Sequence, residues 1–122
     1  MKHFDTFLKN LLTGEKLEKM AELLEHVEKS FPQLKAKVSG LHPMFVDKGI
    51  EIVGFTIFDD FILVTTDAKM IERFQGSIEK AGYMHERASF RIGWDDTIRF
   101  DLLDDIIKAN WQDKQVQTRF WR

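Results

Sequence analysis

The sequence contains no cysteine, and this absence removes several classes of chemistry. Without thiols there is no disulfide, no thiolate nucleophile, no cysteine-ligated iron–sulfur cluster and no cysteine-based zinc site. His, Asp and Glu are then the side chains left to bind a metal. The absence of cysteine also suits a reducing compartment, so we expect the protein to be cytoplasmic.

The chain also has few prolines, no long apolar run and little net charge. Pro32 and Pro43 are the only prolines and no segment resembles a linker, so we expect one domain over residues 1–122. No apolar run approaches the roughly 20 residues of a membrane span, and residues 1–9 do not resemble an export signal. The formal net charge of −2 gives no overall field that would attract a nucleic-acid backbone. We therefore expect neither a membrane nor a nucleic-acid partner.

Apolar residues make up 43% of the chain, and the period at which they recur changes along it. Helical spacing predicts helices near residues 4–12, 17–31, 67–82 and 100–110. Alternation and β-branched residues predict strands near residues 44–46, 50–58, 61–65 and 88–93. The predicted fold class is α+β, an antiparallel sheet of about five strands with N- and C-terminal helices packed on it.

Acidic side chains form a stripe on the second predicted helix. At about 100° per residue, Glu15, Glu18, Glu22 and Glu25 fall within an arc of about 80°, opposite the apolar face. His26 follows Glu22 by four residues, so a carboxylate and an imidazole are placed to meet one ion. The stripe predicts a loose site for a hard cation.

The last predicted helix repeats this arrangement. Asp101, Asp104 and Asp105 lie opposite the apolar side chains of that helix, and Asp95 and Asp96 lie shortly upstream. These aspartates are a second set of candidate metal ligands. Spacing alone favours a simpler interpretation of both acidic faces as ordinary solvated helix surfaces, because favourable pairs four residues apart would neutralise them in part. These pairs are Glu15 with Lys19, Glu25 with Lys29 and Asp104 with Lys108.

Little in the sequence favours catalysis. The serines have no nucleophile-elbow context, the four histidines are scattered, and no glycine-rich run resembles a phosphate-binding loop. We therefore expect a protein that is not an enzyme.

Two features near the C-terminus leave alternatives open. Asn110 falls on the apolar face of the last helix, where it is either a hydrogen-bonded core residue or part of a pocket wall. Trp111, Phe120 and Trp121 lie among basic residues. They either close the core or contact a single-stranded nucleic acid, and the first interpretation is favoured.

Several short motifs, in order, resemble those of the bacterial YdhG-like family, nearly over the whole chain. That family is catalogued partly as a domain of unknown function and partly as a frataxin-like intracellular iron chaperone. The motifs here are Pro43-Met44-Phe45, Ile52-Val53-Gly54-Phe55, Ala81-Gly82-Tyr83, Arg91-Ile92-Gly93-Trp94, Leu102-Leu103, Ile106-Ile107, Asn110, Asp113-Lys114 and Phe120-Trp121-Arg122.

The resemblance implies a frataxin-like fold, iron as a loosely bound ferrous or ferric ion, and delivery of that iron to an Fe–S cluster scaffold or a ferrochelatase. It transfers no iron ligands, so Glu18, Glu22, Glu25 and His26 are predicted from spacing alone. One segment departs from the family. Members tend to have Trp-Asn-Gln before Pro-Met-Phe, whereas this chain has Gly40-Leu41-His42.

An alternative function is a non-enzymatic module that binds a small ligand or a protein partner. Its pocket would lie between the sheet and the last helix. The residues predicted to line it are His42, Pro43, Met44, Phe45, Trp94 and Asn110.

Overall fold

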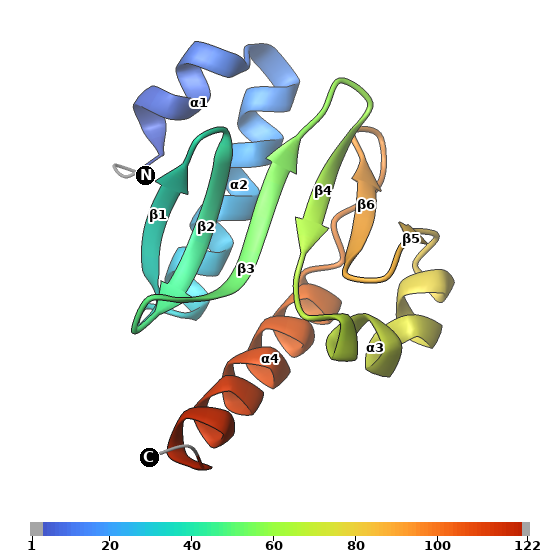
Figure 1. Cartoon of the computed structure of the whole chain (residues 1–122). Helices are drawn as coiled ribbons and strands as arrows, with labels where there is room; N and C mark the ends of the chain where they lie inside the picture. Colours follow the sequence, from blue (N-terminus) through green and yellow to red (C-terminus); the bar gives the residue numbers. More distant parts are fainter. Residues whose placement is uncertain (1–3, 121–122) are drawn as a thin grey trace.

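The computed structural model describes the backbone of residues 4–120 and the side chains of residues 4–116. This range contains four helices and six strands (Figure 1). In chain order they are α1 (Asp5–Leu11), α2 (Gly14–Ser30), β1 (Lys35–Ser39), β2 (His42–Asp47), β3 (Ile50–Ile57), β4 (Phe61–Thr65), α3 (Ala68–Lys80), β5 (Met84–His85), β6 (Ser89–Gly93) and α4 (Phe100–Phe120).

All six strands form one antiparallel sheet, in the order β1-β2-β3-β4-β6-β5. The predicted α+β class is therefore confirmed, with one strand more than expected. The predicted strand ranges lack β1 and the two-residue β5. Gly40 and Leu41 form the tight turn of the β1–β2 hairpin, and the positive φ of Gly40 (60°) permits that turn.

The hydrophobic core lies between the sheet and the helices. In Figure 1, α1 and α2 lie behind the sheet, α3 lies beyond the lower end of β4, and α4 runs below the sheet from that end. Alternate residues of the central strands point toward these helices and are buried. They are Phe45, Val53, Phe55, Ile62, Val64, Phe90 and Ile92.

The helices present apolar stripes to this core, as their spacing predicts. Met20, Leu24 and Val27 of α2 are fully buried, and so are Ile106 and Ile107 of α4. These stripes pack both helices into one shared core, so their opposite, polar sides remain at the surface. No helix within the described residues is long and apolar enough to cross a membrane.

The C-terminal aromatic residues are described only in part. Trp111 is half-buried, lies edge-on to Phe31, and donates a hydrogen bond from Nε1 to Asp47 Oδ2 at 2.9 Å. This contact agrees with the interpretation of Trp111 as a core-closing residue. The side chain of Phe120 and the whole of Trp121 lie outside the described residues.

Candidate functional site

A hollow of about 440 Å³ lies between α2 and the loop that joins β6 to α4. Glu18 and Glu22 line it from α2, and Asp95 and Asp96 line it from the loop. All four carboxylates are exposed. The sequence places the glutamates on one helix face, whereas the tertiary fold brings the two aspartates to them from a distant part of the chain.

A sharp turn after β6 places the aspartates. Gly93 N donates to Asp96 Oδ2 at 2.8 Å, and a Cβ on Gly93 would lie only 2.9 Å from the same oxygen. A side chain at position 93 would therefore displace the Asp96 carboxylate from this close approach. The Asp96 carboxylate is thus held in the turn. The side chain of Asp95, in contrast, has no hydrogen bond within the described residues.

Lys19 also lines the hollow and fixes the same loop. Its Nζ donates to the carbonyl oxygen of Trp94 at 2.7 Å and to that of Asp96. The predicted pairing of Lys19 with Glu15 is therefore wrong, because the long side chain reaches across to the loop instead. The hollow thus contains four carboxylates and one ammonium group.

The four carboxylates do not form a closed metal site. Within the described residues, no group of three or more His, Asp or Glu side chains is close enough together to hold a metal ion. An ion in this hollow would keep most of its water ligands.

The other predicted ligands of α2 lie elsewhere. Glu25 is half-buried and does not line the hollow. His26 faces α4, where its Nε2 lies 2.8 Å from Asp104 Oδ1 and its ring stacks on Phe100. The structure thus brings together two predicted ligands from different helices. The predicted pairing of Asp104 with Lys108 is replaced by this contact.

The remaining aspartates of α4 do not join that pair. Asp101 accepts two hydrogen bonds from the Arg99 guanidinium, at 3.0 and 3.2 Å. These hydrogen bonds lower the pKa of Asp101 below its ordinary value. Asp105 is exposed to solvent. Asp101 is therefore already neutralised by an arginine, which makes it a poor metal ligand.

The six predicted pocket residues lie on both faces of the sheet. His42 and Met44 point to the face that no helix covers, while Pro43 and Phe45 point into the core. His42 Nδ1 lies 2.7 Å from Thr56 Oγ1. None of the six lines the hollows of about 560, 160 and 440 Å³ in the described part of the chain.

The last two predicted pocket residues connect separate elements. Trp94 donates from Nε1 to the carbonyl oxygen of Phe58 at 2.8 Å. Asn110 is 1% exposed and donates from Nδ2 to the carbonyl oxygen of Ile52 at 2.8 Å. Its Oδ1 is buried and has no hydrogen-bond partner among the described residues. Asn110 is therefore a core residue in which one of the two polar side-chain atoms is hydrogen-bonded.

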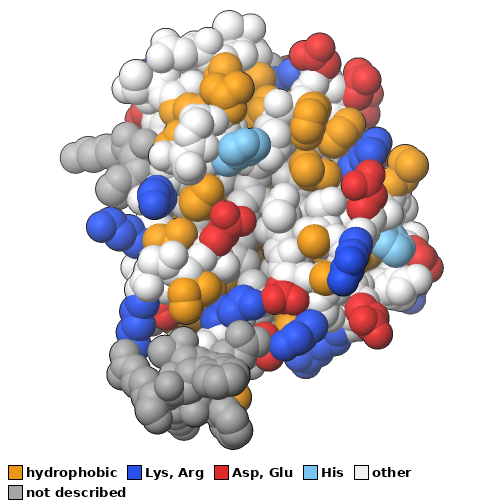
Figure 2. Space-filling model, viewed as in Figure 1, with side chains coloured by type: hydrophobic (Ala, Val, Ile, Leu, Met, Phe, Trp, Pro, Cys, Tyr) orange, Lys and Arg blue, Asp and Glu red, His pale blue; other side chains and the backbone are white. Residues whose placement is uncertain are grey.

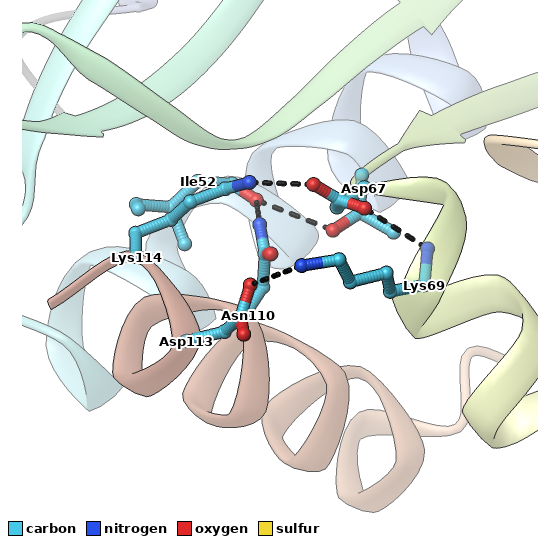
Figure 3. Close-up of polar contacts among 7 residues, drawn as sticks. Ile52, Asp67, Lys69, Asn110, Asp113 and Lys114 are labelled. Carbon is cyan, nitrogen blue, oxygen red and sulfur yellow. Dashed lines mark hydrogen bonds and ion pairs between the residues drawn. The ribbon is translucent and has the colours of Figure 1, made fainter. Parts of the chain in front are cut away.

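Sequence reasoning missed the polar cluster around Asn110 (Figure 3). Lys114 Nζ lies 2.5 Å from Asp67 Oδ2, and Asp67 Oδ1 caps α3 by accepting from Lys69 N at 2.9 Å. The hydrogen bond from Lys114 lowers the pKa of Asp67. Lys69 Nζ lies 3.7 Å from Asp113 Oδ2, and this ion pair also links α3 to α4. The helix that begins after Asp67 was predicted, but the partner that Asp67 finds on α4 has no signal in the local sequence.

These features define a small α+β protein with an antiparallel sheet, four helices and an acidic hollow beside α2. No protein-family model matches the chain. The chain is 29% identical, over 119 residues, to a Bacillus subtilis protein named intracellular iron chaperone frataxin. This match covers 98% of the chain and 97% of the relative.

Two solved structures are similar. A protein of the DUF1801 family (YdhG) from Bacillus subtilis is 28% identical, with a TM-score of 0.88, covering 92% of this chain and 90% of that one. An uncharacterized conserved protein from Lactobacillus casei is also 28% identical, with a TM-score of 0.62 and 91% coverage of both chains. These similarities support the resemblance to the YdhG-like family.

Proposed function

We propose that this protein is a member of the YdhG-like family that binds iron loosely and carries it in the cytoplasm, without catalysing a reaction. The observation that carries the proposal is the hollow lined by Glu18, Glu22, Asp95 and Asp96. The name of the Bacillus subtilis relative, which matches nearly the whole chain, supports iron as the ion.

The chemistry of the hollow suits a cargo that must be released. Carboxylate oxygens bind hard cations such as ferric iron, and ferrous iron also accepts them. An open hollow leaves most of the coordination sphere to water, so the affinity should be about micromolar or weaker. The ammonium group of Lys19 beside the carboxylates lowers the affinity further by Coulomb repulsion.

The iron would be cargo that the protein hands to another protein. By the family resemblance, an Fe–S cluster scaffold or a ferrochelatase would receive it, and no nucleic acid or membrane would take part. An open, exposed site favours such a transfer, because an acceptor with a closed ligand set can take over the ion directly.

Anaerobic titration of ferrous iron followed by calorimetry tests the proposal. Glu18→Gln, Glu22→Gln and Asp95→Asn together should weaken iron binding at least tenfold. The melting temperature should change little, because these side chains are exposed. A matched variant removes the same number of exposed carboxylates elsewhere, by Asp59→Asn, Asp60→Asn and Glu72→Gln, and should bind iron like the wild type.

Three further variants locate the ion. Glu25→Gln and Asp101→Asn, Asp104→Asn, Asp105→Asn test the predicted ligands that lie outside the hollow. His26→Ala should affect ferrous iron more than ferric iron, since imidazole suits the ferrous ion better. A wild-type protein that binds no iron refutes the proposed function. Binding that survives in the hollow variant but not in the aspartate variant would move the site to α4.

A further inference from the structure

The edge of the sheet formed by β1 is open. β1 is the first strand of the order β1-β2-β3-β4-β6-β5 and pairs only with β2 among the described residues. No backbone hydrogen bond of residues 35–39 outside this ladder is found there. The outward N–H and C=O groups of β1 are thus free to pair with an added strand.

The two sides of β1 differ in chemistry. Lys35 and Lys37 lie on the face that no helix covers, since Lys37 pairs with Met44. Both lysines are exposed and form no ion pair within the described residues. Ala36 and Val38 lie on the other side, where Val38 is 37% exposed. In Figure 2, blue side chains gather along the left edge of the molecule, at β1.

We propose that the free edge of β1 binds an extended acidic segment of a partner protein by strand addition. In this mode, backbone hydrogen bonds provide affinity and alternate side chains provide specificity. Because side chains alternate between the two sides of a strand, the segment should alternate acidic residues, facing Lys35 and Lys37, with apolar residues, facing Ala36 and Val38.

Charge argues for an acidic partner rather than a second copy of this chain. Two β1 edges pairing with each other would bring lysine against lysine, and like charges opposite one another destabilise a sheet. Edge lysines normally block strand addition for this reason. An acidic strand converts this repulsion into attraction. The proposal concerns a surface remote from the acidic hollow in sequence and does not depend on iron.

The probe is a soluble hexapeptide of alternating Glu and Val, added to the ¹⁵N-labelled full chain. Binding should shift the amide signals of residues 35–39, slow their hydrogen exchange, and weaken with added salt. The variant Lys35→Glu with Lys37→Glu should bind this peptide at least tenfold more weakly and should bind a Lys and Val peptide instead. Lys80→Glu with Lys108→Glu is the matched control and should behave like the wild type, because these exposed lysines lie on helices.

Several results would overturn the proposal. They are equal binding of the Glu and Val peptide by wild type and the Lys35→Glu, Lys37→Glu variant, signal changes confined to other residues, and a concentration-dependent dimer that protects residues 35–39. If the charge-reversed variant does not fold, peptide binding to the wild-type protein still tests the proposal. Equal binding of the two peptides, or binding that salt does not weaken, refutes the charge complementarity.

Discussion

Asn110 shows how one residue can be both buried and incompletely paired. Its amide nitrogen holds the carbonyl of Ile52, which also accepts a longer hydrogen bond, 3.4 Å, from Thr66 Oγ1. Its Oδ1 is unpaired. A buried acceptor without a donor destabilises a fold, whereas the hydrogen bond to Ile52 stabilises it. The two effects oppose one another in the same side chain.

Asn110→Leu should destabilise the protein by about 1 kcal/mol, near the lower end of the range for a buried hydrogen bond. The change removes the donor to Ile52, but it also removes the unpaired Oδ1, and Thr66 still bonds Ile52. Urea denaturation measures the free energy of unfolding. Asn110→Asp is the comparison and should cost more, because it buries a carboxylate beside a carbonyl oxygen. A leucine variant as stable as the wild type would mean that the unpaired oxygen costs as much as the hydrogen bond gains.

The pair of Lys114 and Asp67 predicts a pH dependence. The hydrogen bond from Lys114 holds the pKa of Asp67 below its ordinary value of 3.8. A lowered pKa in the folded state stabilises the protein above pH 3.8, and this stabilisation is lost as the pH falls through the lower, folded-state pKa. Lys114→Met should therefore cost about 1 kcal/mol at pH 7, and the difference from the wild type should shrink below pH 3.8.

Thermal unfolding of both proteins between pH 2 and pH 7 measures this difference. Lys108→Met is the matched control, because Lys108 is an exposed lysine on the same helix. It should unfold like the wild type throughout. A cost of Lys114→Met that stays constant down to pH 2 would show that packing of the lysine stem, and not its charge, is what matters.

At the scale of elements, α4 is the helix that ties the fold together. It packs on β3 and α3 and contacts α2 through the pair of His26 with Asp104. Trp111 adds a link to Asp47, at the end of β2. Polar contacts beyond the apolar stripe thus determine where the second half of α4 lies.

The link between Trp111 and Asp47 can be measured by a double-mutant cycle with Trp111→Phe and Asp47→Ala. Phenylalanine keeps an aromatic ring beside Phe31 but lacks the indole N–H. The coupling energy should be about 0.5–1.5 kcal/mol, as for one hydrogen bond. Trp94→Phe, which removes a bond to Phe58 instead, should show no coupling to Asp47→Ala. Coupling near zero for Trp111 would mean that this hydrogen bond does not hold α4 in solution.

At the scale of the whole molecule, one core connects every layer. A single cluster of buried residues includes side chains from both ends of the described chain, from Phe4 to Ala109. A shared core of this kind favours one cooperative unit. If residues 1–122 form the single domain that the sequence predicts, the whole chain should unfold as that one unit.

We expect unfolding in one two-state transition. Far-ultraviolet circular dichroism, which follows the helices, and tryptophan fluorescence, which follows Trp94 and Trp111 among others, should give the same midpoint and the same free energy of unfolding. Two separated transitions, one for fluorescence and one for helicity, would contradict the single domain.

The α+β class follows from the sequence, since apolar periods of about 3.6 and 2 residues require different backbones to bury one face. The glutamate stripe of α2 and the cap at Asp67 are predictable for the same reason, because each depends on residues within a turn or two. Local patterns do not distinguish a turn such as Gly40-Leu41 from a break, so β1 was not predicted.

Which residues from distant parts of the sequence lie close together was decided by the tertiary structure. Asp95 and Asp96 reach Glu18 and Glu22 only because the fold places the β6–α4 loop beside α2. Lys19, His26 and Lys114 each form a contact across more than 40 residues of sequence, in place of or beside the local pairs that helical spacing favours. A long side chain bonds to whichever group the fold brings within reach, and helical periodicity carries no information about that group.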